Sequence, residues 1–241
     1  RGISGVGASM RSVGNLARGF QGQLAALGVG VGVAGMLKLA ADAETAQVKF
    51  EVLLGSQAKA AAMMKEINTL AAETPFQKLD IANATQKLLA FGSAEGDVLT
   101  QIRQLGDIAA LTGTNIGDLA DIYGKAQVQG RLFAEDINQL TGRGIPIIKE
   151  LAKQFGVAES GVRELVTAGK VSSENIAIAF RDMTSEGGQF AGGMARLSQT
   201  TAGKFSTMVD NMKQAGAEIG AAFLPMAARI LDSVTEWAKV F

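Results

Sequence analysis

Two pairs of neighbouring carboxylates are the first candidates for chemistry in this 241-residue sequence. Glu135 directly precedes Asp136, and Asp118 lies close before Asp121. Glycoside hydrolysis needs two carboxyl groups that face each other across a cleft, one of them with a raised pKa. Neither pair predicts such a cleft. We therefore interpret both pairs as solvated helix faces or as acidic first turns of helices.

The sequence contains no histidine and no cysteine. It therefore lacks the usual general base near neutral pH, the commonest metal ligand, thiolate nucleophiles and disulfides. Serine is plentiful, but a serine nucleophile needs a base, and no Ser-x-x-Lys motif occurs together with supporting motifs. We predict no catalytic residues, no metal site and no cofactor. Zero formal net charge and thinly spread basic residues also argue against sequence-specific nucleic-acid binding.

Two glycine-containing segments are similar to functional loops. The segment Gly28–Gly32 looks like part of a dinucleotide-binding turn, but no predicted strand precedes it and no strand–helix–strand unit follows. A second loop is more unusual, and two interpretations of it stay open. It is either a turn between helices, with its arginine capping carbonyls or pairing with an acidic residue, or a contact with another subunit. Its residues are Arg143, Gly144, Ile145 and Pro146.

The elements that must position these residues are predicted to be helices, packed into a compact domain over residues 42–200. Apolar residues recur at helical spacing in several windows, which predicts helices that each bury one face. The clearest sets are Ile102, Leu105 and Ala109, then Ile116, Leu119, Tyr123 and Ala126, and then Ile148, Leu151, Ala152 and Phe155. No alternating pattern of useful length predicts a strand.

Residues that begin and end helices support the same interpretation. Asn115 and either Ser172 or Ser173 are predicted to cap helix starts. Glycines are predicted to end helices at Gly92, Gly113, Gly130, Gly156 and Gly169. Pro75 and Pro146 mark helix starts or turns. The predicted fold class is thus all-α, a compact multi-helix domain with a different segment on either side.

The N-terminal segment, residues 1–41, is rich in glycine and small residues, and no charge occurs between Arg18 and Lys38. A membrane-spanning helix needs roughly 20 mostly apolar residues, and small residues allow helices to approach closely. Two interpretations stay open, a flexible or self-packing segment and a membrane-active one. The residues of the candidate membrane segment are Leu24, Leu27, Gly28, Gly30, Gly32, Gly35 and Leu37. Because the chain begins at Arg1, we expect it to be part of a longer product.

Residues 201–241 predict one long amphipathic helix. Its apolar stripe repeats every eleven residues, which predicts a nearly straight seam with a weak right-handed supercoil. Pro225 should bend this helix or free a carbonyl. The stripe could bury against the domain or against copies of itself, and we favour self-association because it runs to the last residue. The stripe consists of Met208, Met212, Ala215, Ile219, Phe223, Met226, Ile230, Val234, Trp237 and Phe241.

An ordered series of short segments runs from about residue 43 to residue 213. In sequence order they are Ala43–Ser56, Ala72–Phe76, Leu88–Gly92, Leu105–Ala109, Gln129–Leu132, Asp136–Leu140, Gly144–Pro146, Gly169–Val171, Gly187–Phe190, Ser198–Thr200 and Gly203–Ser206. Their order and spacing together resemble the conserved tape measure domain of long-tailed phages and related prophage elements.

The resemblance implies a structural protein of the phage tail and no shared catalytic residues. Such a protein is a ruler that lies in the tail tube during assembly, so that the length of its helical rod sets tail length. The implied locations are the tube lumen or the tail tip of the virion, after assembly in the bacterial cytoplasm. The implied partners are the protein itself, with a trimer favoured, and tail tube and tail tip or baseplate hub proteins.

The length of the chain limits its part in such a ruler. A straight helix rises about 1.5 Å per residue, so the whole chain could span at most roughly 360 Å. We therefore expect the ruler proper to lie mostly outside this piece. Family members also leave the tail during infection and help DNA cross the cell envelope, which motivates the alternative of a membrane-active delivery module. A peptidoglycan hydrolase is a third hypothesis, based on family analogy alone.

Overall fold

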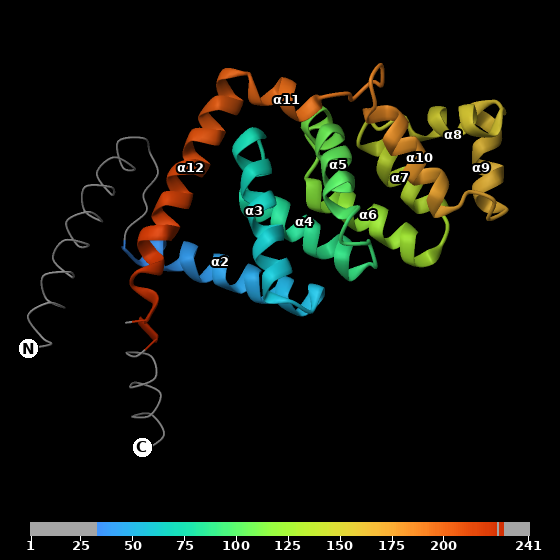
Figure 1. The fold of residues 1–241 in the computed structure, drawn as a ribbon. Helices are drawn as coiled ribbons and strands as arrows, with labels where there is room; N and C mark the ends of the chain where they lie inside the picture. Colours follow the sequence, from blue (N-terminus) through green and yellow to red (C-terminus); the bar gives the residue numbers. More distant parts are fainter. Residues whose placement is uncertain (1–32, 226, 229–241) are drawn as a thin grey trace, which may run out of the picture. The chain divides into compact units, whose positions relative to one another are not determined.

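The computed structural model describes residues 33–225 and 227–228, and this described part is built from α-helices (Figure 1). The helices are α2 (Val33–Leu54), α3 (Gln57–Glu73), α4 (Lys78–Ala90), α5 (Val98–Thr112), α6 (Ile116–Gln129), α7 (Ala134–Gly142), α8 (Ile147–Phe155), α9 (Glu159–Thr167), α10 (Ser173–Thr184), α11 (Gly193–Ser198) and α12 (Thr201–Ala221). The one β-type pairing among the described residues is an isolated bridge between Arg131 and Ser172. The predicted all-α fold is confirmed.

The described residues belong to two compact units, which we treat separately. One unit comprises residues 49–207, and the other combines the described residues before 49 with those after 207. These limits lie slightly C-terminal of the boundaries predicted at residues 42 and 200. Both α2 and α12 run without a break across a limit.

Helix starts and ends in the 49–207 unit follow the residues that predicted them. The Asn115 side chain accepts a hydrogen bond from the Gly117 N–H at 2.7 Å, and Ser172 Oγ accepts one from Asn175 N–H at 3.3 Å. The expected stop glycines all have positive φ, a region that costs glycine little; they are Gly92, Gly113, Gly130, Gly156 and Gly169. Pro146 directly precedes α8, and Pro75 lies between α3 and α4.

The packing of α4 against α6 forms the centre of this unit. The backbone of Gly124 on α6 lies so close to the Phe91 ring that a side chain there would overlap it. Lys87 on α4 pairs with Asp121 on α6 at 2.7 Å. The predicted stripes on α5 and α6 are buried throughout. On α8, Leu151 and Ala152 are buried, but Ile147 replaces Ile148 as the buried residue of the first turn.

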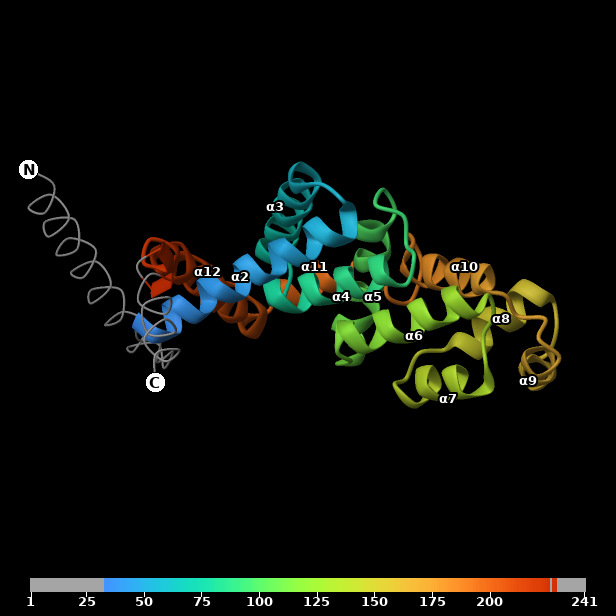
Figure 2. The same cartoon turned by 90° about the horizontal axis from the view of Figure 1, so that it is seen from below.

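Helices α7, α8 and α9 form a lobe that is closed at its base by backbone pairing (Figure 2). The Leu132 N–H donates to the Val171 carbonyl at 2.9 Å, and the Ser173 N–H donates to the Gly130 carbonyl at 3.1 Å. Two segments of the ordered series, Gln129–Leu132 and Gly169–Val171, thus lie side by side. The chain therefore enters and leaves the lobe at one point.

In the other unit, the N-terminal part of α2 packs against the C-terminal part of α12. The backbone of Gly220 contacts the carbonyl of Met36 and leaves no room for a side chain. Gly216 and Gly220 are buried on α12, as are Met36 and Ala40 on α2. The two helices therefore approach each other through glycine and small or flexible side chains.

The helix predicted over residues 201–241 is interrupted rather than continuous, since α12 ends at Ala221. Pro225 has no N–H to donate to the Ala221 carbonyl, and its ring would clash with that carbonyl. The N–H groups of Ala222 and Phe223 instead donate to Ile219 and Gly220, at 3.2 and 2.9 Å, in a tighter turn. Residues 224, 225, 227 and 228 are helical again. The predicted effect of Pro225 is thus a break in the α-helix.

Candidate interaction surfaces

The predicted apolar stripe is not the most buried face of α12. Met208 is 38% exposed, and the next four stripe residues, Met212, Ala215, Ile219 and Phe223, are half-buried. The buried positions of α12 are Gly203, Gly216 and Gly220. The glycine positions thus make the close contacts within the chain, and the stripe keeps accessible surface. Met226, Ile230, Val234, Trp237 and Phe241 lie outside the described residues.

Sequence analysis missed Phe205 as a member of this surface. It lies on α12 three residues before Met208 and is 51% exposed, although the eleven-residue repeat would place the preceding stripe position at Lys204. An exposed phenylalanine next to an exposed methionine is a larger apolar area than a single residue, and such areas often mark contact sites. The strict eleven-residue repeat does not include it, but its position three residues before Met208 could have identified it as a residue on the same side of the helix.

The loop from Arg143 to Pro146 has the contacts expected of a turn between helices. Arg143 Nη1 donates to the Gln139 carbonyl at 3.0 Å, and Arg143 Nη2 lies 3.5 Å from the Asp118 carboxylate. Gly144 has a φ of 77°, and Ile145 is buried. The interpretation of this loop as a helix–helix turn is confirmed. Its contact with another subunit stays a prediction.

Each of the four carboxylates considered for chemistry has a structural contact. Asp118 faces Arg143, and Asp121 pairs with Lys87. Asp136 Oδ2 accepts the Phe133 N–H at 2.9 Å in the first turn of α7, and Glu135 accepts from the Gln139 amide at 3.3 Å. The interpretation as helix faces and first turns is confirmed by these contacts.

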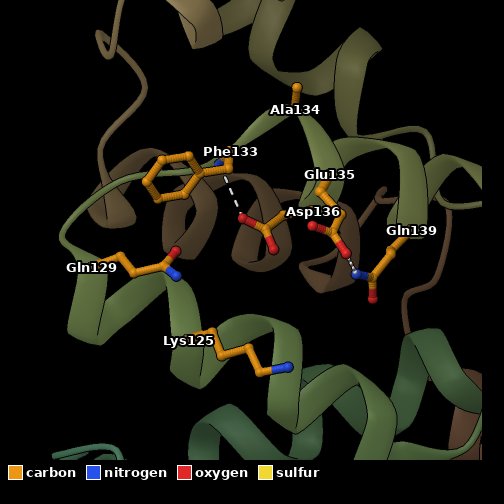
Figure 3. A pocket seen from close by; sticks show the side chains of 7 residues that line it. All are labelled: Lys125, Gln129, Phe133, Ala134, Glu135, Asp136 and Gln139. Carbon is orange, nitrogen blue, oxygen red and sulfur yellow. Dashed lines mark hydrogen bonds between the residues drawn. The ribbon is translucent and has the colours of Figure 1, made fainter.

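An open hollow of about 460 Å³ lies between α6 and α7 (Figure 3). Lys125 and Gln129 line it from α6, and residues 133–136 and Gln139 line it from the other side. Phe133 is 38% exposed, and the Arg131 guanidinium lies 4.5 Å from the centre of its ring. The hollow thus combines one ammonium group, two carboxylates and an aromatic edge.

Asp107 on α5 is a second residue that sequence analysis missed. Its Oδ1 accepts the Met194 N–H at 2.9 Å, and the Gly192 N–H also bonds its carboxylate, so that it caps α11 from another helix. Burial raises the pKa of Asp107, while these two hydrogen bonds and the charge of Arg103 act in the opposite direction. Burial likewise raises the pKa of Tyr123. No local signal around Asp107 predicted a partner so distant in the sequence.

The candidate membrane segment falls largely outside the described residues. Leu24, Leu27, Gly28, Gly30 and Gly32 lie there, whereas Gly35 and Leu37 belong to α2. None of the helices in the described ranges is both long and apolar enough to cross a bilayer. Within the same ranges, no group of acidic residues is arranged to hold a metal ion. The membrane-active interpretation therefore stays a prediction.

Comparison with known proteins places this architecture in a family. The family model described as tape measure protein matches residues 34–221, which include all but the last few described residues. The chain belongs to the tape measure protein family. The family is one of structural phage proteins and is not a known enzyme family.

Two relatives support the assignment. The chain is 27% identical to the Mu-like prophage FluMu protein gp42 of Haemophilus influenzae, over 98% of this chain and 37% of that protein. It is also 27% identical to the probable tape measure protein of Escherichia phage Mu, over 66% of this chain and 23% of that protein. The chain thus spans well under half the length of either relative. No solved structure matches it.

Proposed function

We propose that this chain is a folded domain of a tape measure protein and takes part in setting tail length, while the rod that measures the tail lies elsewhere in the parent protein. The observation that carries the proposal is the family match over residues 34–221, which includes the whole compact helical unit of residues 49–207. A folded domain is a poor ruler, because only a continuous straight helix becomes longer by about 1.5 Å with each added residue.

The location of the ruler outside the domain follows from lengths. The longest described helix, α2, has 22 residues and would measure only about 33 Å. The chain covers 37% and 23% of its two relatives, so each relative has much more sequence in which a rod could lie. The domain then acts as a fixed body that the rod holds in the tube lumen or at the tail tip.

Tail length in particles that carry a modified parent protein tests this proposal. Deleting helical residues outside this chain should shorten the tail by about 1.5 Å per residue. Removing or inserting a few residues in the exposed turn near Gly142 should leave tail length unchanged. Electron micrographs of particles provide both measurements. A tail that lengthens in proportion to insertions within residues 49–207 would contradict the proposal.

The stripe of α12 is the proposed surface for association with a second copy of the chain. Replacing Ile219 or Phe223 with Asp should weaken association, because burial of an unpaired charge costs several kcal/mol. The matched control is a change at exposed Glu218 on the same helix, for example Glu218→Gln. Sedimentation of the intact chain gives the result, and an unchanged oligomeric state in both Asp variants would exclude the stripe as an interface.

DNA delivery is the second candidate function, supported by the uncharged segment between Arg18 and Lys38. If this segment acts on membranes, the intact chain should release dye from liposomes. A variant that lacks residues 19–37 should release none. Absence of leakage at every protein concentration would exclude this function and would leave the structural role unaffected.

A further inference from the structure

We propose that α11 is a detachable clasp, which holds the start of α12 on the 49–207 unit and can open while the core around α4 and α6 stays folded. The inference concerns the mechanics of the domain and goes beyond its part in the tail. It rests on how α11 is attached on its three sides: to α5, to α10 and to α12.

The contact with α5 is close, and it involves a helix of only six residues. Among the described residues of α11, only Gly193 and Met194 are buried. The backbone of Gly193 contacts the Asp107 carbonyl, and Met194 fills the space where Gly106 has no side chain. Figure 1 shows α11 beside one end of α5. The apolar part of the attachment therefore centres on two complementary glycine positions, on Met194 and on the Leu111 side chain beside Gly193.

The polar part of the attachment is the carboxylate of Asp107. It accepts the N–H groups of Met194 and Gly192, which α11 could not satisfy within itself. A helix of six residues is too short to persist alone, since isolated helices below about 12 residues are marginal in water. Helix α11 thus depends on α5 for its structure, and loss of this contact should unfold or release it.

The segment that joins α10 to α11 is anchored at Phe190 and has a hinge after it. Phe190 is buried and donates its N–H to the Met183 carbonyl at 2.8 Å, so the chain is held up to this residue. Gly192 follows with a φ of 62°, and Gly193 comes next. Two consecutive glycines after a buried anchor allow a wide range of backbone angles. The hinge therefore lies at Gly192–Gly193.

The corner between α11 and α12 is tight and should move as one body. The backbone of Gly203 contacts the Leu197 carbonyl, and the Gly203 N–H donates to Thr200 Oγ1 at 3.0 Å. Beyond this corner, Ser206 Oγ donates to the Pro75 carbonyl at 3.3 Å. Thr207 Oγ1 lies 3.4 Å from the Thr74 carbonyl and 3.0 Å from the Gly203 carbonyl of its own helix. These long contacts also attach the start of α12 to this unit. Opening would release α11 and the first turns of α12 together.

The absence of cysteine from the sequence allows a direct test with single thiols. In the full chain, Met194→Cys places a buried thiol in the clasp, and Ala120→Cys places one in α6, where the alanine is fully buried. We expect a maleimide to label the clasp thiol at least ten times faster than the α6 thiol. Adding Asp107→Ala should speed clasp labelling about tenfold and leave α6 labelling unchanged.

Hydrogen exchange of the wild-type chain provides a second measurement, because Met194→Cys itself shortens a side chain of the clasp. Amides of residues 193–207 should exchange through an opening that α4 and α6 do not share. Gly106→Ala should raise that exchange, and Gly142→Ala, at a glycine with open space around it, should not. Equal labelling rates at the two thiols, or one common exchange rate for α11, α4 and α6, would overturn the proposal. Neither result would bear on tail length.

Discussion

The packing of α6 on α4 and the packing of α11 on α5 both use a glycine for close approach, but different side chains fill the space beside the two glycines. At the first contact, Gly124 accepts the Phe91 ring within a broad interface that includes fully buried Leu88 and Leu119. At the second, Gly106 accepts a single methionine, and a carboxylate caps the short helix. A close approach by itself therefore says little about how much a contact stabilises the fold.

The largest expected effect is at the α4–α6 contact. Leu88 is fully buried, so Leu88→Ala should lower the free energy of unfolding by about 3 kcal/mol through lost burial and a cavity. Urea unfolding followed by circular dichroism measures the change. Leu79 on the same helix is 44% exposed, and Leu79→Ala should cost no more than about 0.5 kcal/mol. Similar losses for both variants would remove the distinction between core and surface on α4.

Substitutions at the α11–α5 contact should lower the free energy of unfolding by less, and their total effect should be limited. Met194→Ala should cost about 2 kcal/mol, the value of one buried methionine. Combined with Asp107→Ala, the loss should fall short of the sum of the two single losses, because either change opens the same clasp. Fully additive losses in a double-mutant cycle would show that α11 unfolds together with the core.

The N-terminal cap of α6 comes from Asn115 beside that helix, whereas the cap of α11 comes from Asp107 on α5. Asn115 caps α6 through the Gly117 N–H, so Asn115→Ala should lower the free energy of unfolding by about 1 kcal/mol. When Asn115→Ala is added to the Met194→Cys variant, the rate at which maleimide labels the clasp thiol should stay unchanged, since α6 is not part of the clasp. Faster labelling of that thiol would show that the α6 cap and the α11–α5 contact are energetically coupled.

The smallest expected effect is a dependence on pH from Asp107. Burial raises its pKa above the ordinary 3.8, so the folded state binds its proton more tightly than the unfolded chain does. Stability from this group therefore falls as pH rises from about 3.8 to the raised value, and is constant above it. Wild-type stability relative to Asp107→Asn should decline over this window in urea titrations. A rise in relative stability with pH would contradict the sign of the shift.

Much of the fold was predictable because helices are signalled locally. Asn115, Ser172 and the stop glycines act through backbone conformation and hydrogen bonds within a few residues, which a single sequence reveals. The apolar stripes of α5 and α6 were equally clear, since burial of one helix face requires that spacing.

The contacts that the sequence did not predict join distant residues. Nothing near Asp107 indicates that it caps a helix 87 residues later, and nothing near Gly124 indicates the Phe91 ring. The stripe of α12 was correctly recognised as apolar, but its relation to the buried glycines Gly216 and Gly220 depends on where α2 packs. The presence of Pro225 predicted a disturbance of the last helix, and in the structure α12 ends at Ala221.

A density map of the intact tail tests most directly whether this chain is a folded domain of a tape measure protein rather than part of its rod. We expect the map to show one compact helical body of the size of residues 49–207, in the tube lumen or at the tail tip, joined to extended helical density along the tube. Extended density for residues 49–207 along the tube, with no compact body in the particle, would contradict it.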